Sequence, residues 1–187
     1  MHYKGYRYMA KLDLSIFDLS PIAMWIQDFS GVKQIFEQWK AEGIQNIKEY
    51  LLEVPERLQP CLATIRTIHI NNSALRLYEA ENLEEIIENF SKLHFEKISH
   101  FKVNFFYSLW KNEANFAIPA VNYTCKGKQI DIQLRANILP GYEDNWERLL
   151  LTTENISDYQ NARRFSESIF TYSPTPLWIK DYNKKKT

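Results

Sequence analysis

The spacing of hydrophobic and polar residues divides the chain into segments of different secondary structure. Residues 23–29 form a short, apolar, β-prone run that predicts a first strand. Apolar residues then recur every three to four positions up to Gly43, which predicts a helix that ends at a glycine. Two short helices follow, one ending before Pro55 and one over 56–63. The first third of the chain is therefore one strand and a group of helices.

The middle of the chain repeats this order of strand and helices. Residues 65–70 predict a second strand, and Asn71 is positioned to cap the helix after it. Asn82 and Glu85 have the spacing of a capping box, which predicts the start of another helix. Apolar residues at helical spacing predict a longer helix over about 95–110.

The last third changes from helical to strand periodicity. Residues 117–125 are strand-like, a glycine-containing turn follows, and residues 129–139 alternate strictly between apolar and polar. A last strand is predicted over 148–153. The polar positions of the alternating strand are Asp131, Gln133, Arg135 and Asn137. The order of elements predicts an α+β fold, with one antiparallel sheet and helices on one side.

A segment near the start of the chain returns near its end. Residues 16–29 and 169–182 share Ile, Phe, Ser, Pro, Trp, Ile and Asp in step, at a shift of 153 positions. Self-similarity at a fixed shift indicates a duplicated unit. We therefore expect a lead-in over 1–15, one complete domain over 16–158, and a linker helix with the start of a second, truncated copy over 159–187.

Composition excludes several classes of function. The chain has 23 basic and 23 acidic residues, so we expect neither nucleic acid nor a charged membrane as a partner. The sequence has no stretch of 18 apolar residues, so it predicts no membrane-spanning helix. The two cysteines lie far apart, as expected for reduced thiols in a cytoplasmic protein. The four histidines and two cysteines lack the spacing of metal ligands, so no metal is expected.

Five segments together resemble the PAS domain, in the bacterial sensory type that has extra helices between its first two strands. The likeness covers about residues 16–162. The segments are Ser20-Pro21 with Met24-Trp25-Ile26, Ile70 to Tyr78, Tyr123 to Asp131, Leu139-Pro140-Gly141-Tyr142-Glu143, and Thr153 to Ser157. Glu79 departs from the glycine usual at its position, and Asn155-Ile156-Ser157 stands where the family has Asp-Ile-Thr. The resemblance implies a five-stranded antiparallel sheet, helices packed on one face, and a helical insertion after the first strand.

The resemblance also implies a function. The implied function is that of a non-enzymatic sensory module that senses a small molecule or mediates dimerisation. Such a module would be the N-terminal input region of a histidine kinase or diguanylate cyclase. Repacking of the core would shift the helix that leaves the last strand and feeds downstream PAS and output domains of the same chain. The alternative from a different class is an α+β small-molecule enzyme, hydrolase-like, on a similarly curved sheet. That enzyme would need a nucleophile and a base that meet in the fold.

The signal-transfer junction is expected at Glu154, Asn155, Ile156, Ser157 and Asp158, between the last strand and the outgoing helix. We expect Ile156 to be buried at the end of the sheet. We expect Ser157 or Asp158 to cap the helix.

The candidates for binding a small molecule are Arg135, Asn137, Asn71 and Trp110. If the polar row of the alternating strand faces the helices, Arg135 or Asn137 could hold an anionic or carbonyl ligand. If the row faces away, it lies in solvent or at a partner interface. Trp110 can equally be a core residue.

No cofactor is expected. A haem would need a well-placed histidine, but His94 and His100 are six residues apart and so lie on different faces of a helix. Flavin chemistry of the LOV type would need a cysteine in an Asn-Cys-Arg-Phe segment, and neither Cys61 nor Cys125 lies in one.

The N-terminal lead-in is apolar for a free tail, which predicts a homodimer. Its apolar residues would otherwise form a substantial exposed patch. They are Tyr3, Tyr6, Tyr8, Met9, Leu12 and Leu14.

Overall fold

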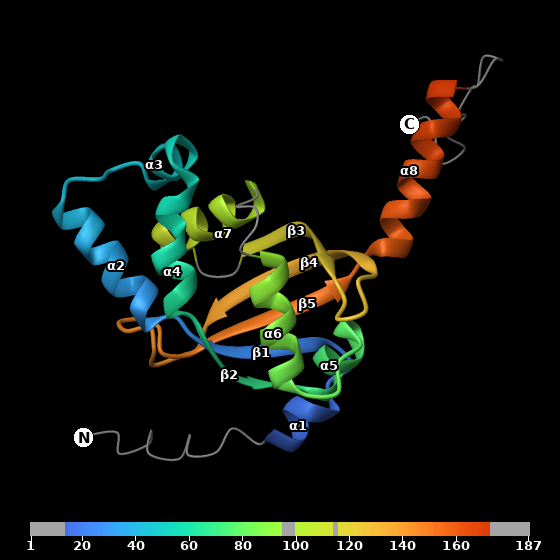
Figure 1. The fold of residues 1–187 in the computed structure, drawn as a ribbon, viewed down its shortest axis with the longest axis horizontal. Helices are drawn as coiled ribbons and strands as arrows, with labels where there is room; N and C mark the ends of the chain where they lie inside the picture. The colour runs from blue at the N-terminus through green and yellow to red at the C-terminus, as the bar shows by residue number, and fades with distance from the viewer. Residues whose placement is uncertain (1–13, 95–99, 114–115, 173–187) are drawn as a thin grey trace, which may run out of the picture.

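The computed structural model describes residues 14–94, 100–113 and 116–172 (Figure 1). Most of the lead-in and of the second copy lies outside these ranges. The elements are α1 (Leu14–Leu19), β1 (Ala23–Asp28), α2 (Ser30–Ala41), α3 (Ile47–Glu53), a 3-10 turn (Pro55–Leu58), α4 (Gln59–Thr64), β2 (Arg66–Ile70), α5 (Asn72–Tyr78), α6 (Leu83–His94), α7 (His100–Trp110), β3 (Phe116–Tyr123), β4 (Gln129–Ile138), β5 (Leu149–Asn155) and α8 (Ser157–Tyr172).

The five strands form one antiparallel sheet in the order β2-β1-β5-β4-β3. The register places Trp25, Leu151, Ala136 and Phe116 in one row across four strands. This row faces the helices, and the alternate positions form what we call the outer face. Figure 1 shows α6 crossing in front of the strands, while α8 projects away from the end of the sheet. The predicted α+β fold with five antiparallel strands is confirmed.

Two predicted boundaries are wrong. The last strand, β5, continues to Asn155 because its backbone stays paired with β4 as far as Ile132. The helix predicted over 56–63 is a 3-10 turn followed by α4, since Pro60 lies inside the segment and Pro55 starts it. The first residues of the helix predicted over 95–110 lie outside the described ranges, and from His100 to Trp110 the helix is buried on most sides rather than on one stripe.

The helical insertion packs around one aromatic ring. Phe36 of α2 lies within 6.2 Å, centroid to centroid, of the rings of four residues: Trp39, Phe106, Trp110 and Trp146. Helix α2 approaches α4 closely at Gly31, where an added Cβ would lie 2.5 Å from Cβ of Thr64. The insertion is thus part of the same core as the sheet.

The end of α5 explains one departure from the PAS motifs. Glu79 is the C-cap of this helix and adopts the left-handed conformation, with φ of 53°. That conformation suits glycine, which the family usually has at this position. The backbone therefore keeps the shape of the motif although the residue differs.

The start of α6 uses its expected cap in a modified form. Oδ1 of Asn82 accepts a hydrogen bond of 2.9 Å from the backbone N–H of Glu85. The carboxylate of Glu85 accepts from the N–H of Glu81 rather than from that of Asn82. The helix begins as predicted, but the second half of the capping box reaches one residue further back.

Candidate functional site

One residue of β4 joins the sheet to the outgoing helix. The backbone C=O of Asp131 accepts a hydrogen bond of 2.8 Å from the N–H of Ile156, and its N–H donates at 2.9 Å to Oγ of Ser157. Its carboxylate accepts at 3.0 Å from Nη2 of Arg164 in α8. We call Asp131, Ile156, Ser157 and Arg164 the junction. Its four residues link β4 to the first two turns of α8.

The junction differs from the expected one in three respects. Glu154 and Asn155 belong to β5, and Asp158 is exposed without contributing to the contacts of Asp131. The predicted cap is wrong: Oδ1 of Asn155 accepts from the N–H of Ser157, because the Ser157 hydroxyl is already used by Asp131. Ile156 is half-buried rather than buried, since it lies where the chain leaves the sheet.

Beyond the junction, the described side chains of α8 have little contact with the domain. Tyr159 and Phe165 are each 67% exposed, and residues 161–168 are all exposed. Arg163 and Glu167 form an ion pair within the helix, with Nε and Oε1 2.7 Å apart. The position of α8 therefore depends on the junction rather than on apolar packing.

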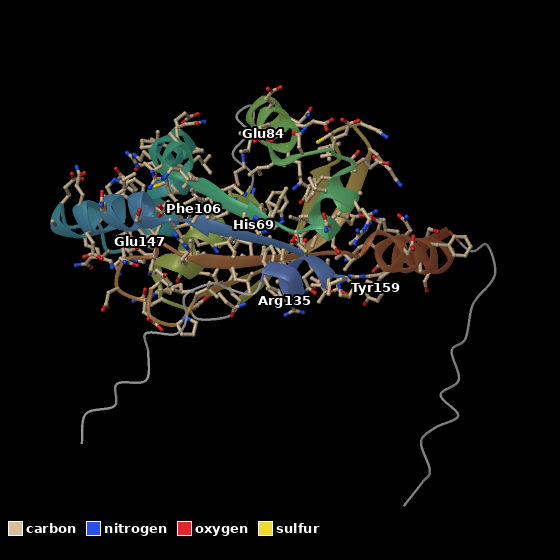
Figure 2. All side chains as sticks on the ribbon, turned by 90° about the horizontal axis from the view of Figure 1, so that it is seen from below. His69, Glu84, Phe106, Arg135, Glu147 and Tyr159 are labelled. Atoms are coloured by element: carbon tan, nitrogen blue, oxygen red, sulfur yellow. The ribbon has the colours of Figure 1, made fainter. Side chains whose placement is uncertain are left out.

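The polar row of β4 lies on the outer face of the sheet. Ala136 is buried against the helices, so the neighbouring Arg135 and Asn137 point the opposite way. Figure 2 shows Arg135 on the side of the sheet away from Glu84 of α6. Arg135 is exposed, and its Nη2 lies 3.2 Å from Oε1 of Gln133. The hypothesis that these two residues hold a ligand between sheet and helices is therefore wrong.

Asn71 is a structural residue rather than a ligand-binding one. It is completely buried, and Nδ2 donates to the backbone C=O of Phe17 and of Ile22. Its Oδ1 accepts from the N–H of Met24 and of Ala74. Both donors and both acceptor positions of the amide are used within the fold. The cap of α5 is confirmed, but no atom of this side chain is left for a ligand.

Trp110 belongs to the aromatic packing of the insertion. Its ring lies 5.2 Å from that of Phe36 in an edge-to-face arrangement, and Nζ of Lys40 lies 5.1 Å from its centroid. The structure therefore does not bring the four candidate ligand residues together: two lie on the outer face, one is the buried cap of α5, and one is at the end of α7, packed against the insertion.

The sequence analysis missed a buried polar group between α5 and the sheet. The hydroxyl of Tyr78 accepts a hydrogen bond of 3.0 Å from Nδ2 of Asn122, and Thr153 lies beside the same hydroxyl. Burial raises the pKa of Tyr78, which keeps its hydroxyl protonated. The available signal was the register of the strands, since Asn122 and Thr153 are polar residues at positions where their strands face the helices.

The histidines and cysteines form no cluster in the described residues that could hold a metal ion. His100 is exposed and His69 packs its ring on Phe17, with centroids 5.2 Å apart. Burial raises the pKa of Cys61 to about 12. The pKa of Cys125 is also raised, by burial and then by the carboxylate of Glu85. Both thiols are therefore weak nucleophiles at neutral pH.

The chain was compared with known proteins. No family model and no curated protein matches the sequence. Among solved structures, an RNA-binding light-oxygen-voltage receptor superposes with a TM-score of 0.56 at 10% identity, over 91% of this chain and 40% of that receptor. The LOV protein of Rhodobacter sphaeroides gives 0.49 at 14% identity, over 81% of this chain and 69% of its own. The PAS domain of Bordetella pertussis BvgS gives 0.40 at 7% identity, over 84% and 93%.

The chain has the PAS fold. Sheet order, helical face and motif positions agree with the resemblance found in the sequence. Sequence identities this low establish the fold alone. They do not identify a ligand or a partner of this chain. No helix in the described ranges is both long and apolar enough to cross a membrane.

Proposed function

We propose that this PAS domain is a cytoplasmic, non-enzymatic sensory module that passes the state of its sheet to α8 through the junction. The observation that carries the proposal is the set of three contacts made by Asp131. One residue of β4 contacts the residue that follows β5, the first residue of α8 and the second turn of α8. A displacement of β4 would therefore reach the helix directly.

The strength of these contacts suits a switch. Arg164 is about half exposed, so its ion pair with Asp131 contributes about 1 kcal/mol or less. Two conformations that differ by a few kcal/mol can be exchanged by a ligand that binds one of them better. The junction can thus change its arrangement while the core stays folded.

The input we propose is a small polar molecule bound near Tyr78, Asn122 and Thr153. These residues supply a hydroxyl, an amide and a second hydroxyl inside an otherwise apolar layer. Thr153 is two residues from the end of β5, so a ligand there would act on the strand that precedes α8. We propose no LOV-type flavin and no haem, which is supported by the lack of an Asn-Cys-Arg-Phe segment around Cys61 and Cys125 and by the exposure of His100.

We also propose that the domain self-associates and that α8 leads to a second PAS unit. The repeat supports the second part, because its shift of 153 positions maps α1 onto residues 167–172, the last turns of α8. The proposed host, a histidine kinase or diguanylate cyclase, rests on the resemblance of the motifs.

The proposal is tested by breaking the side-chain contact of the junction, the Asp131–Arg164 ion pair, from either side. In Asp131→Asn and Arg164→Ala we expect amide hydrogen exchange in α8 to increase at least about fivefold. Exchange in β1 and α5 should stay unchanged. The matched control is Asp158→Asn, a carboxylate in the same helix that Asp131 does not contact.

Two results would contradict the proposal. Unchanged exchange in α8 in both junction variants would show that the ion pair between Asp131 and Arg164 does not hold the helix. An equal increase in Asp158→Asn would show that α8 responds to any loss of charge. Either result would leave α8 as a plain connector.

A further inference from the structure

The edge strand β3 leaves an apolar row uncovered on the outer face. Its side chains alternate between the core and the outer face, and Phe116, Ile118 and Ala120 pack against the core. Val121 is 52% exposed and Tyr123 is 40% exposed. The outer-face residues of β3 are Ala117, Pro119, Val121 and Tyr123, and all four are exposed. No described residue covers this row.

The edge of β3 is unsuited to pairing with a further strand. Pro119 lies in the middle of the strand and has no N–H to donate. Proline on an edge strand is one of the ways in which proteins prevent strand addition. Contact at this side of the molecule is therefore expected through the face of the sheet rather than through its edge.

The same face carries one positive and one negative side chain that do not form an ion pair with each other. Arg135 of β4 is in register with Thr152, and Glu154 of β5 is in register with Gln133. Both charged residues are exposed, and neither forms an ion pair in the described part of the chain. A third charge on the face, that of Asp131, is already paired with Arg164.

The other half of the outer face is covered. Phe17 of α1 is buried and packs against His69 of β2, while Ile26 of β1 is also buried on this side. Figure 2 shows α1 on the same side of the sheet as Arg135. The free part of the face is thus the part formed by β3, β4 and β5.

We propose that two copies of this chain pack through the outer face of β3, β4 and β5, related by a two-fold axis that sets Arg135 against the partner's Glu154. A two-fold interface brings the same surface together twice, so it must be complementary to itself. One exposed arginine and one exposed glutamate, beside a row of apolar residues, meet that condition and form two ion pairs across the axis. The inference rests on the proposed self-association and specifies its surface.

The outer face of β3, β4 and β5 is small, so we expect the dimer to be weak. It comprises fewer residues a side than the roughly 20 to 30 of a standard stable interface. The dimer should therefore be weak and concentration-dependent. Sedimentation velocity from about 10 µM to about 500 µM covers the corresponding range of dissociation constants.

Charge exchange tests the interface. In Arg135→Glu and in Glu154→Arg, like charges face each other twice, and the dissociation constant should rise at least about tenfold. An equimolar mixture of the two variants should dimerise again, because both pairs across the axis are then of opposite charge. The matched control is Glu84→Arg on α6, which reverses the same charge on the opposite side of the molecule (Figure 2). Circular dichroism confirms that each variant is folded.

The outcomes separate the interface from self-association itself. A wild-type chain that stays monomeric up to about 500 µM overturns both proposals. A wild-type dimer that neither variant weakens overturns the interface alone. A shorter chain that lacks residues 1–14 and is monomeric would then assign the contact to the N-terminal lead-in. Two weakened variants that fail to dimerise when mixed would show that Arg135 and Glu154 do not face each other.

Discussion

The two faces of the sheet are built from the same strands but make different contacts. On the helix-covered face, aromatic and aliphatic side chains from β1, β4 and β5 pack against the helices, and the insertion extends this layer through the rings around Phe36. On the outer face and at the end of the sheet, single hydrogen bonds and ion pairs such as Asp131–Arg164 replace packed area. The comparison indicates that the covered face holds the fold, while the part of the outer face formed by β3, β4 and β5 and the end of the sheet are less tightly packed.

The largest loss of stability is expected at the centre of the aromatic cluster. Phe36→Ala removes a buried ring that contacts four others and leaves a cavity, which should lower the free energy of unfolding by about 3–5 kcal/mol. Urea denaturation measures the change. The control is Phe165→Ala in the exposed part of α8, where we expect less than about 0.5 kcal/mol. Equal losses in the two variants would refute the difference between the regions.

The next largest effect tests whether Asn71 is structural. Asn71→Ala leaves two backbone N–H and two C=O groups without this partner, and we expect a loss of about 2–4 kcal/mol. The neighbouring Asn72 is exposed, so Asn72→Ala should cost less than about 1 kcal/mol. Thermal unfolding of the pair gives the difference. A stable Asn71→Ala protein would reopen a ligand-binding role.

A smaller, pH-dependent loss of stability is expected at Asp28, the last residue of β1. Burial alone would raise the pKa of Asp28, but hydrogen bonds from Ser30 and the charge of Arg66 outweigh it and lower the pKa below its ordinary value of 3.8. A carboxylate with a lowered pKa stabilises the fold at pH values above 3.8, and this contribution is lost as the pH falls through the folded-state pKa.

We therefore expect Asp28→Asn to be less stable than the wild type by about 1 kcal/mol at pH 7, with the difference shrinking below pH 3.8. Chemical denaturation between neutral and acid pH measures it. Asp144→Asn, in the exposed loop before β5, serves as the control. A difference that stays constant with pH would exclude the ionised carboxylate as its cause.

The smallest effect is a gain. Glu79 holds a left-handed conformation that glycine adopts without strain, so Glu79→Gly should stabilise the domain by about 0.5–1 kcal/mol. Glu79→Ala keeps the Cβ and should show no gain. If both variants gain equally, the benefit comes from removing the carboxylate rather than from the backbone.

Local patterns in the sequence predicted most of the elements and few of the side-chain roles. The alternation along 129–138 gave the strand and the division of its residues between two faces. It could not tell which face the helices cover, and for that reason the environment of Arg135 and Asn137 stayed open between the ligand side and the solvent side. The helix after Asn71 was predicted from its cap, but the three further bonds of that amide join segments about 50 residues apart.

The junction shows the same limit. The sequence placed the passage from the last strand to the outgoing helix within a few residues, because that transition is local. The central residue of the junction lies elsewhere: Asp131 contacts Ser157 and Arg164, which are 26 and 33 positions away. Only the pairing of β4 with β5 brings these residues together. Likewise, Tyr78 and Asn122 are 44 positions apart and become neighbours only when α5 packs against β3.

The length of α8 has a consequence for whatever follows it. Its 16 residues form one uninterrupted helix with a total length of about 24 Å. Each residue rotates the helix by about 100° about its axis. A segment attached to its end therefore has a defined rotational phase relative to the sheet. Inserting one residue in the exposed stretch after Arg164 would rotate that segment by about 100° with little change in distance, whereas inserting seven would lengthen the helix by about 10 Å and almost restore the phase. Torsion and separation can thus be varied independently at this single element.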